Sequence, residues 1–129
     1  NQAKELSVFD NIEIVKRVEH KNIYNYIAQS TVGVLSNRYD ADGLLFTSPL
    51  KLYEYLGSGL KVVVSRLPSI ESNINESLVY YATPEKPESF AKEIIRALDD
   101  DDFDINKIKD FSKNYTWESR SKKFMEFIS

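Results

Sequence analysis

The chain has 129 residues and a formal net charge of −3, with 42% hydrophobic and 29% charged residues. This length and composition predict one ordinary soluble globular domain. The acidic balance argues against a nucleic-acid-binding protein, and the absence of cysteine excludes disulfides and thiolate metal sites. No apolar run approaches the roughly 18–20 residues that span a bilayer. Because the chain starts at Asn1 in what reads as a helix, we expect it to be a piece of a longer protein.

The first third of the chain predicts strands alternating with a helix. Apolar residues alternate with polar ones at the start of residues 12–18, which indicates a strand. Helical spacing of apolar residues predicts a short helix over residues 22–29, with Asn22 as its cap. The mostly β-branched residues 31–35 predict a buried strand. Residues 36–47 form a long polar loop, and long loops at strand ends are often functional.

Residues 48–65 carry the most informative pattern in the chain. Ser48 can cap a helix, and Pro49 fits the first helical position, where a missing N–H has no cost. The backbone N–H groups of Leu50 and Lys51 would then lie at the positive end of the helix dipole, beside an ammonium. Such a helix start favours an anion, and phosphate is a common one.

The helix that follows this start admits two interpretations. Lys51 and Glu54 are three residues apart, and an exposed ion pair between them is the simpler interpretation of that spacing. In the functional interpretation, Lys51 faces a phosphate and Glu54 accepts hydrogen bonds from the hydroxyls of a sugar. Gly57 and Gly59 follow a helix rather than a strand, so they predict a helix end and not a dinucleotide-binding fingerprint.

Further strands and helices complete an alternating order. Residues 61–65 predict an inner parallel strand, residues 68–75 a turn or short helical piece, and residues 78–81 another strand. Pro87 opens a helix with an apolar stripe, which consists of Phe90, Ala91, Ile94, Ile95 and Leu98. Strands that alternate with helices predict an α/β fold, with a Rossmann-like parallel sheet covered by helices on both faces.

The end of the chain predicts two more helices. The acidic run of residues 99–102, with Asp104, ends the preceding helix, and we interpret it as a solvated loop rather than a metal site. Residues 105–111 predict a short helix. A last helix begins at Thr116, a good cap, and Trp117 is expected to anchor it to the core.

Ligands of parallel α/β sheets bind at the carboxyl ends of the strands. Three predicted loops meet at that edge, namely residues 19–21, 36–47 and 66–72, and the helix start at residues 48–51 lies there too. The single histidine, His20, follows a strand on this edge. One histidine supplies no zinc site, and we assign it no catalytic part.

Residues 48–65 resemble the donor-binding motif of the GT-B glycosyltransferases of the group 1 type. The family form is a Glu, seven residues, a second Glu, small residues and a Gly, and then an apolar strand that ends in Ser or Thr. Residues 12–20 resemble the family's preceding strand and loop, and Thr116-Trp117-Glu118 with Arg120 resembles the start of its C-terminal helix. The resemblance implies the C-terminal half of a GT-B fold, a second Rossmann-like domain that lacks its first strand and helix.

The resemblance also implies roles for individual residues. Glu54 matches the second Glu, which binds the ribose, and Arg17 and Val18 match the loop that touches the base. The segment that cradles the diphosphate matches Ser48, Pro49, Leu50 and Lys51. The first Glu of the family motif, which often addresses the donor sugar, falls on Phe46 here, and Asp40 or Asp42 is left as its substitute by position.

The predicted function is therefore a donor-binding domain over residues 1–129. It binds a nucleoside-diphosphate sugar for transfer to a glycan or lipid-linked acceptor, without a metal or another cofactor. The resemblance implies that the catalytic residues lie in another half of the enzyme. It also implies that the full enzyme is cytoplasmic, with peripheral attachment at the inner face of the membrane, and that this piece alone performs no turnover. The alternative is a flavodoxin-like signalling module with Asp40 and Asp42 as an acidic metal pocket.

Overall fold

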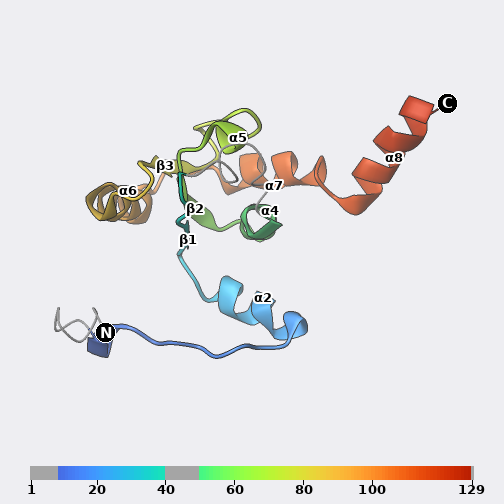
Figure 1. Cartoon of the computed structure of the whole chain (residues 1–129). Helices are drawn as coiled ribbons and strands as arrows, with labels where there is room; N and C mark the ends of the chain where they lie inside the picture. Colours follow the sequence, from blue (N-terminus) through green and yellow to red (C-terminus); the bar gives the residue numbers. More distant parts are fainter. Residues whose placement is uncertain (1–8, 40–49, 129) are drawn as a thin grey trace.

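The computed structural model describes residues 9–39 and 50–128, without the side chains of Phe9, Trp117 and Arg120. Strands and helices alternate through most of the described chain (Figure 1). In chain order the elements are η1 (Phe9–Asn11), α2 (His20–Ala28), β1 (Val32–Leu35), α4 (Leu50–Gly57), β2 (Lys61–Ser65), α5 (Pro68–Glu71), β3 (Tyr80–Ala82), α6 (Pro87–Asp99), α7 (Ile105–Lys113) and α8 (Trp117–Ile128).

The described strands form one parallel sheet in the order β1-β2-β3. Val63, in the middle of β2, stands opposite Val34 of β1 and Tyr80 of β3. Helix α6 lies on one side of this sheet, while α4 and α5 lie on the other (Figure 1). The predicted α/β class, with a Rossmann-like parallel sheet covered on both faces, is confirmed.

The three valines of β2 explain why two layers of helices are needed. Val62 and Val64 belong to the core cluster under α4 and α7, whereas Val63 belongs to the cluster under α6. All three side chains are 0% exposed. Because successive side chains of a strand point to opposite faces, an unbroken apolar run must be covered on both sides. Each such side chain contributes on the order of 1.5–3 kcal/mol of transfer free energy.

Helix α4 ends in a Schellman motif. Gly59 has a φ of +77°. Its N–H donates to the carbonyl of Leu56 at 2.9 Å, and the N–H of Leu60 donates to the carbonyl of Tyr55 at 3.0 Å. A left-handed residue at this position strongly favours glycine. The prediction that the glycines mark a helix end is confirmed.

A second glycine sets the distance between α4 and the sheet. A Cβ atom on Gly33 of β1 would lie 2.6 Å from Cδ2 of Tyr55 and 2.9 Å from Cδ2 of Leu60. Only a residue without a side chain lets the Tyr55 ring pack directly against the strand. Gly33 therefore fixes how closely α4 approaches β1.

The C-terminus of α6 is held by a lysine from β2. The Nζ of Lys61 donates to the carbonyls of Ala97 at 2.8 Å and Asp100 at 2.6 Å. The hydroxyl of Tyr80 donates to Oδ2 of Asp100 at 2.6 Å. Within the acidic run, Asp100 thus has a structural partner in the sheet, which the prediction of a solvated loop did not include. Asp104, just beyond, accepts from two backbone N–H groups at the start of α7.

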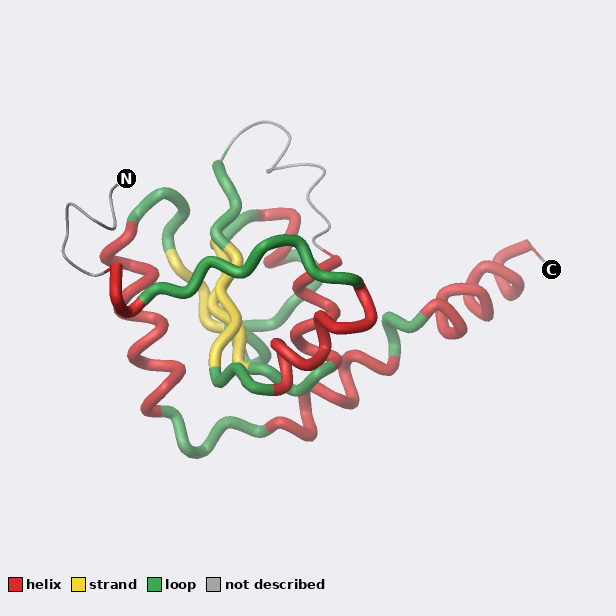
Figure 2. The backbone as a smooth tube through the Cα atoms, turned by 90° about the horizontal axis from the view of Figure 1, so that it is seen from below, coloured by secondary structure: helices red, strands yellow, loops and turns green. Residues whose placement is uncertain are grey.

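The predicted strand over residues 12–18 is wrong. These residues have no regular secondary structure and lead along an extended path into α2 (Figure 2). Ile12 is 45% exposed and Ile14 is 73% exposed. A strand needs a neighbour for its N–H and C=O groups, and no described strand pairs with this segment. The predicted cap of α2 is wrong as well, because the helix begins at His20 and the N–H of Asn22 donates to the carbonyl of Glu19.

The apolar stripe of α6 is less buried than predicted. Phe90, Ile94 and Ala97 of α6 pack in the cluster around Val63, but Ile95 and Leu98 are 59% and 50% exposed. These three residues stand at positions i, i+4 and i+7, so the face of α6 that contacts the sheet is narrower than its apolar stripe. Helix α8 projects away from the sheet in both views (Figures 1 and 2). Its apolar residues Phe124, Met125, Phe127 and Ile128 are exposed.

The predicted start of α8 agrees with the structure. The Oγ1 atom of Thr116 accepts from the N–H of Ser119 at 3.1 Å, as expected of a cap. The core role predicted for Trp117 concerns a side chain outside the described residues. The side chain of Arg120, which is part of the resemblance to the family, also lies outside the described residues.

Candidate functional site

At the carboxyl edge of the sheet, one buried serine connects the end of β2 to the segment that follows β1. Ser65, the last residue of β2, is 0% exposed. Its Oγ atom accepts from the N–H of Asn37 and donates to the carbonyl of the same residue, both at 2.8 Å. Both backbone groups of Asn37 are thereby satisfied. The chain that leaves β1 is fixed beside the end of β2.

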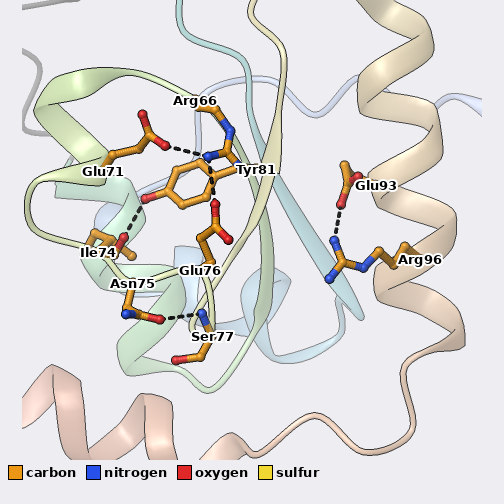
Figure 3. Close-up of polar contacts among 9 residues, drawn as sticks. All are labelled: Arg66, Glu71, Ile74, Asn75, Glu76, Ser77, Tyr81, Glu93 and Arg96. Carbon is orange, nitrogen blue, oxygen red and sulfur yellow. Dashed lines mark hydrogen bonds and ion pairs between the residues drawn. The ribbon is translucent and has the colours of Figure 1, made fainter.

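An arginine network follows directly after β2 (Figure 3). The guanidinium of Arg66 contacts Oε1 of Glu71 at 2.6 Å and Oε1 of Glu76 at 2.8 Å. It also lies 4.7 Å from the ring centroid of Tyr81, whose hydroxyl donates to the carbonyl of Ile74 at 2.7 Å. The hydrogen bond to Glu76 is the main cause that raises the pKa of Arg66. Burial opposes it, and the hydrogen bond to Glu71 and the charges of both carboxylates raise the pKa further. Two carboxylates already hold this cation, so we treat the network as structural.

Helix α4 presents the candidate site. Its chain direction runs back from the carboxyl edge, because it connects β1 to the parallel strand β2. Leu50 and Lys51 lie at its exposed beginning. The first N–H groups of a helix have no partner within the helix, and they carry a partial positive charge. The described start of α4 can therefore receive an anion.

A pocket of about 500 Å³ opens beside this helix start. We call it the Lys51 pocket. It lies between the extended segment before α2, α2 itself, β1 and α4. Its lining consists of Val15, Lys16, Val18, Ile23, Tyr26, Ile27, Ser30, Val32, Gly33, Val34, Lys51, Glu54, Tyr55 and Leu60.

The Lys51 pocket brings together three of the predicted site residues, Lys51, Glu54 and Val18. Arg17, predicted beside Val18, is exposed and is not part of the lining. Lys16 takes a place there instead and adds a second ammonium, which sequence reasoning missed. The two adjacent cations Lys16 and Arg17 indicated a positive charge near the site. Which of the two lines the pocket depends on the direction of each side chain, and the sequence does not give that direction.

A second hollow of about 930 Å³ lies on the other side of Glu54. We call it the Tyr24 groove. It runs along α4 between α2 and the end of α7, and it is lined by His20, Tyr24, Leu50, Tyr53, Glu54, Gly57, Ser58, Lys109, Ser112, Lys113, Tyr115 and Thr116. Glu54 lines both hollows, so this residue stands between them.

The charged partner of Glu54 is not the predicted one. Nε2 of His20 lies 3.7 Å from Oε1 of Glu54. Among the described residues, Lys51 makes no ion pair with Glu54, so the ion-pair interpretation of their spacing is wrong. The separation of 3.7 Å is longer than a hydrogen bond. The Glu54 carboxylate thus keeps its acceptor capacity.

Several predicted residues lie outside the described chain. These are Ser48 and Pro49 of the helix start, Asp40 and Asp42 of the loop, and Phe46. Within residues 9–39 and 50–128, no three acidic or histidine side chains gather as metal ligands. In the same residues no helix combines the length and the hydropathy needed to cross a bilayer.

Comparison with known protein families shows the family of this chain. A family model described as "Glycosyl transferases group 1" matches residues 1–100 of the chain. The chain belongs to this family. The match covers α4 and the three strands and ends just after α6, so α7 and α8 lie beyond it. Membership of the group 1 glycosyltransferases favours sugar transfer over the signalling-module alternative. None of the curated proteins compared with the chain matches it.

Proposed function

We propose that the chain is the part of a group 1 glycosyltransferase that binds a nucleoside-diphosphate sugar, for transfer to a glycan or lipid-linked acceptor. One observation supports this most strongly. Lys51 and Glu54 line a single pocket at the exposed start of α4, in a chain of this family. A cation at a helix start suits a diphosphate, and a carboxylate one turn later suits sugar hydroxyls.

The diphosphate is assigned to the beginning of α4. The N–H groups of the first turn, at Leu50 and Lys51, would receive the anion, and the Lys51 ammonium adds a full charge. Ser48 and Pro49 complete this cradle in the proposal. Lys16, which also lines the Lys51 pocket, is a further cation in the same hollow.

The ribose is assigned to Glu54. A carboxylate accepts two hydroxyl donors at once, which matches the vicinal hydroxyls of a ribose. The Glu54 side chain is 32% exposed, so a ligand reaches it. The resemblance gives the base to Arg17 and Val18. The family residue for the donor sugar falls on Phe46, so Asp40 or Asp42 is proposed as its substitute by position alone.

Catalysis in this proposal is positioning together with stabilisation of the departing diphosphate. The helix start and Lys51 stabilise the negative charge that grows on the leaving group. The acceptor site and the catalytic base belong to another half of the enzyme, so the present chain alone performs no turnover. The whole enzyme would work at the cytoplasmic face of a membrane through peripheral attachment.

Isothermal titration with UDP and GDP tests the proposal. We expect Lys51→Met and Glu54→Gln each to weaken binding about tenfold or more, since hydrogen bonds to charged groups contribute roughly 1.5–3 kcal/mol. Lys92→Met, which removes an exposed ammonium from α6, is the matched control and should leave binding unchanged. No binding of either nucleotide, or binding that is indifferent to both site variants, would contradict the proposal.

A further inference from the structure

We propose that protonation of His20 lowers the affinity of this site for the donor, because the imidazolium competes with the ribose hydroxyls for the carboxylate of Glu54. The inference rests on the proposed function, in which Glu54 binds the ribose. It adds a control of that same site by pH.

His20 and Glu54 are close enough for a small movement to join them. Nε2 of His20 lies 3.7 Å from Oε1 of Glu54, which is longer than a hydrogen bond. A movement of about 0.5–1 Å would bring the two atoms within hydrogen-bond distance. The histidine side chain is 74% exposed, so its ring has room to turn toward the carboxylate.

The charge of the imidazole decides whether that movement is favourable. A neutral imidazole has one N–H group and one acceptor nitrogen, whereas an imidazolium has two N–H groups and a positive charge. Hydrogen bonds from a charged donor to a carboxylate are shorter and stronger than those between neutral groups. Imidazoles of model peptides take up a proton near pH 6.5, so modest acidification produces the charged form.

The imidazolium and the ribose would use the same oxygen atoms. In the proposed function, both carboxylate oxygens of Glu54 accept from the vicinal hydroxyls of the ribose. An imidazolium that donates to Oε1 takes part of this capacity and holds the carboxylate toward the Tyr24 groove, which His20 and Glu54 both line. His20 does not line the Lys51 pocket, so the contacts that we assign to the diphosphate at Lys51 stay intact.

The other titratable groups around the pair do not change charge over the same interval in model peptides. Lysines, tyrosines and carboxylates titrate outside pH 6 to pH 8. His20 is the only histidine of the chain, so its imidazole is the side chain that titrates there. The surrounding groups are the ion pairs Lys21–Glu19 and Lys113–Asp110, the lysines Lys16, Lys51 and Lys109, and the tyrosines Tyr24, Tyr53 and Tyr115.

Calorimetric titrations at pH 6 and pH 8 test the inference. UDP-glucose and GDP-mannose are the probes, because their phosphates are diesters and lack the second ionisation near pH 6 of a phosphate monoester. We expect the wild-type protein to bind the donor that it accepts about two- to threefold more weakly at pH 6 than at pH 8, the size expected of an exposed ion pair.

Two variants of His20 fix its charge. His20→Gln has no charge at either pH, so it should bind the donor equally at both and like the wild-type protein at pH 8. His20→Lys keeps a positive charge, so it should bind at both pH values at least as weakly as the wild-type protein at pH 6.

Proton release gives a second measurement, made with buffers of different ionisation enthalpy. If the donor favours neutral His20, its binding near pH 6.5 releases a fraction of a proton from the wild-type protein and none from His20→Gln. A merely structural role of His20 would change the free energy of unfolding and would release no proton on binding.

The outcomes separate this inference from the function on which it rests. Wild-type protein that binds neither donor at pH 8 overturns both. Binding at pH 8 with the same pH dependence and the same proton release in wild type and His20→Gln overturns the competition and leaves the donor site intact. Tighter wild-type binding at pH 6, which a general attraction between imidazolium and diphosphate would give, also overturns it. So does a His20→Lys variant that binds as tightly as His20→Gln.

Discussion

His20, the first residue of α2, and Glu54, in the middle of α4, approach each other with Nε2 and Oε1 3.7 Å apart. The histidine side chain is 74% exposed and the glutamate side chain 32%. Such an exposed contact is an ion pair only when the histidine is protonated. Even then it contributes little to folding, since water screens the charges and two side chains lose freedom. The contact therefore joins two helices at a candidate ligand site without being needed for stability.

A double-mutant cycle tests this weak coupling. We expect His20→Ala and Glu54→Ala to show a coupling free energy below about 1 kcal/mol in urea unfolding at pH 6 and pH 8. Nucleotide binding that is lost in the Glu54 variant then reports ligand contacts rather than a damaged fold. A coupling of several kcal/mol would mean that the pair holds α2 in place, against our interpretation.

Gly33 should tolerate no side chain. Gly33→Ala places a methyl group against the Tyr55 ring, so we expect the free energy of unfolding to fall by about 1–3 kcal/mol. Gly57→Ala is the matched control in α4, because a Cβ there meets no atom within 4 Å and its φ is not left-handed. The control should be neutral or more stable by about 0.5–1 kcal/mol. Equal stability of the two variants in urea unfolding would refute the close approach.

The side chain of Lys61 should contribute more to the free energy of unfolding than an exposed lysine of α6 does, because it donates to two carbonyls at the end of this helix. Lys61→Met removes donors to the carbonyls of Ala97 and Asp100, and we expect a loss of about 1–3 kcal/mol in thermal or urea unfolding. Lys92→Met, on the exposed surface of α6, should cost less than about 0.5 kcal/mol. A Lys61 variant as stable as the Lys92 variant would exclude the capping role.

Two tyrosines should make the fold sensitive to alkali. Burial raises the pKa of Tyr81 to about 12. Burial, together with the hydrogen bond to Asp100, also raises the pKa of Tyr80 well above its ordinary value. Above about pH 10 the unfolded chain releases these protons while the folded chain keeps them, so the free energy of unfolding falls as the pH rises.

Phenolate absorbance measures this difference. Of the eight tyrosines, we expect Tyr80 and Tyr81 to ionise late in the folded protein and normally in urea. Tyr80→Phe and Tyr81→Phe should each remove one late step. Ionisation of all tyrosines together near pH 10, with the fold intact, would contradict the prediction.

Local patterns predicted most of the fold because they act within a few residues. The valines of β2, Pro87 at the start of α6 and the glycine end of α4 each impose their structure through backbone or burial alone. Residues 12–18 show the limit of this reasoning. Alternating side chains predict a strand, but a strand also needs a pairing partner, and the pattern does not reveal whether one is present.

The candidate site was also predictable where it depends on residues close together in the sequence. The spacing of Lys51 and Glu54 placed them near each other on α4, and the structure puts both in one pocket. The partner of Glu54 and the choice of Lys16 over Arg17 depend on where α2 and the preceding segment lie. That position is set by tertiary packing over long sequence separations.

The central place of β2 also determines how the molecule opens. This strand is hydrogen-bonded on both sides, and its valines join the two core clusters, so its amides exchange with solvent only when the sheet itself comes apart. The exposed helix α8 can open alone. Amide hydrogen exchange would therefore rank the chain from a slow centre at Val62–Val64 to a fast C-terminal helix. Helix α4, with one face in the core and one at the pockets, would fall between them.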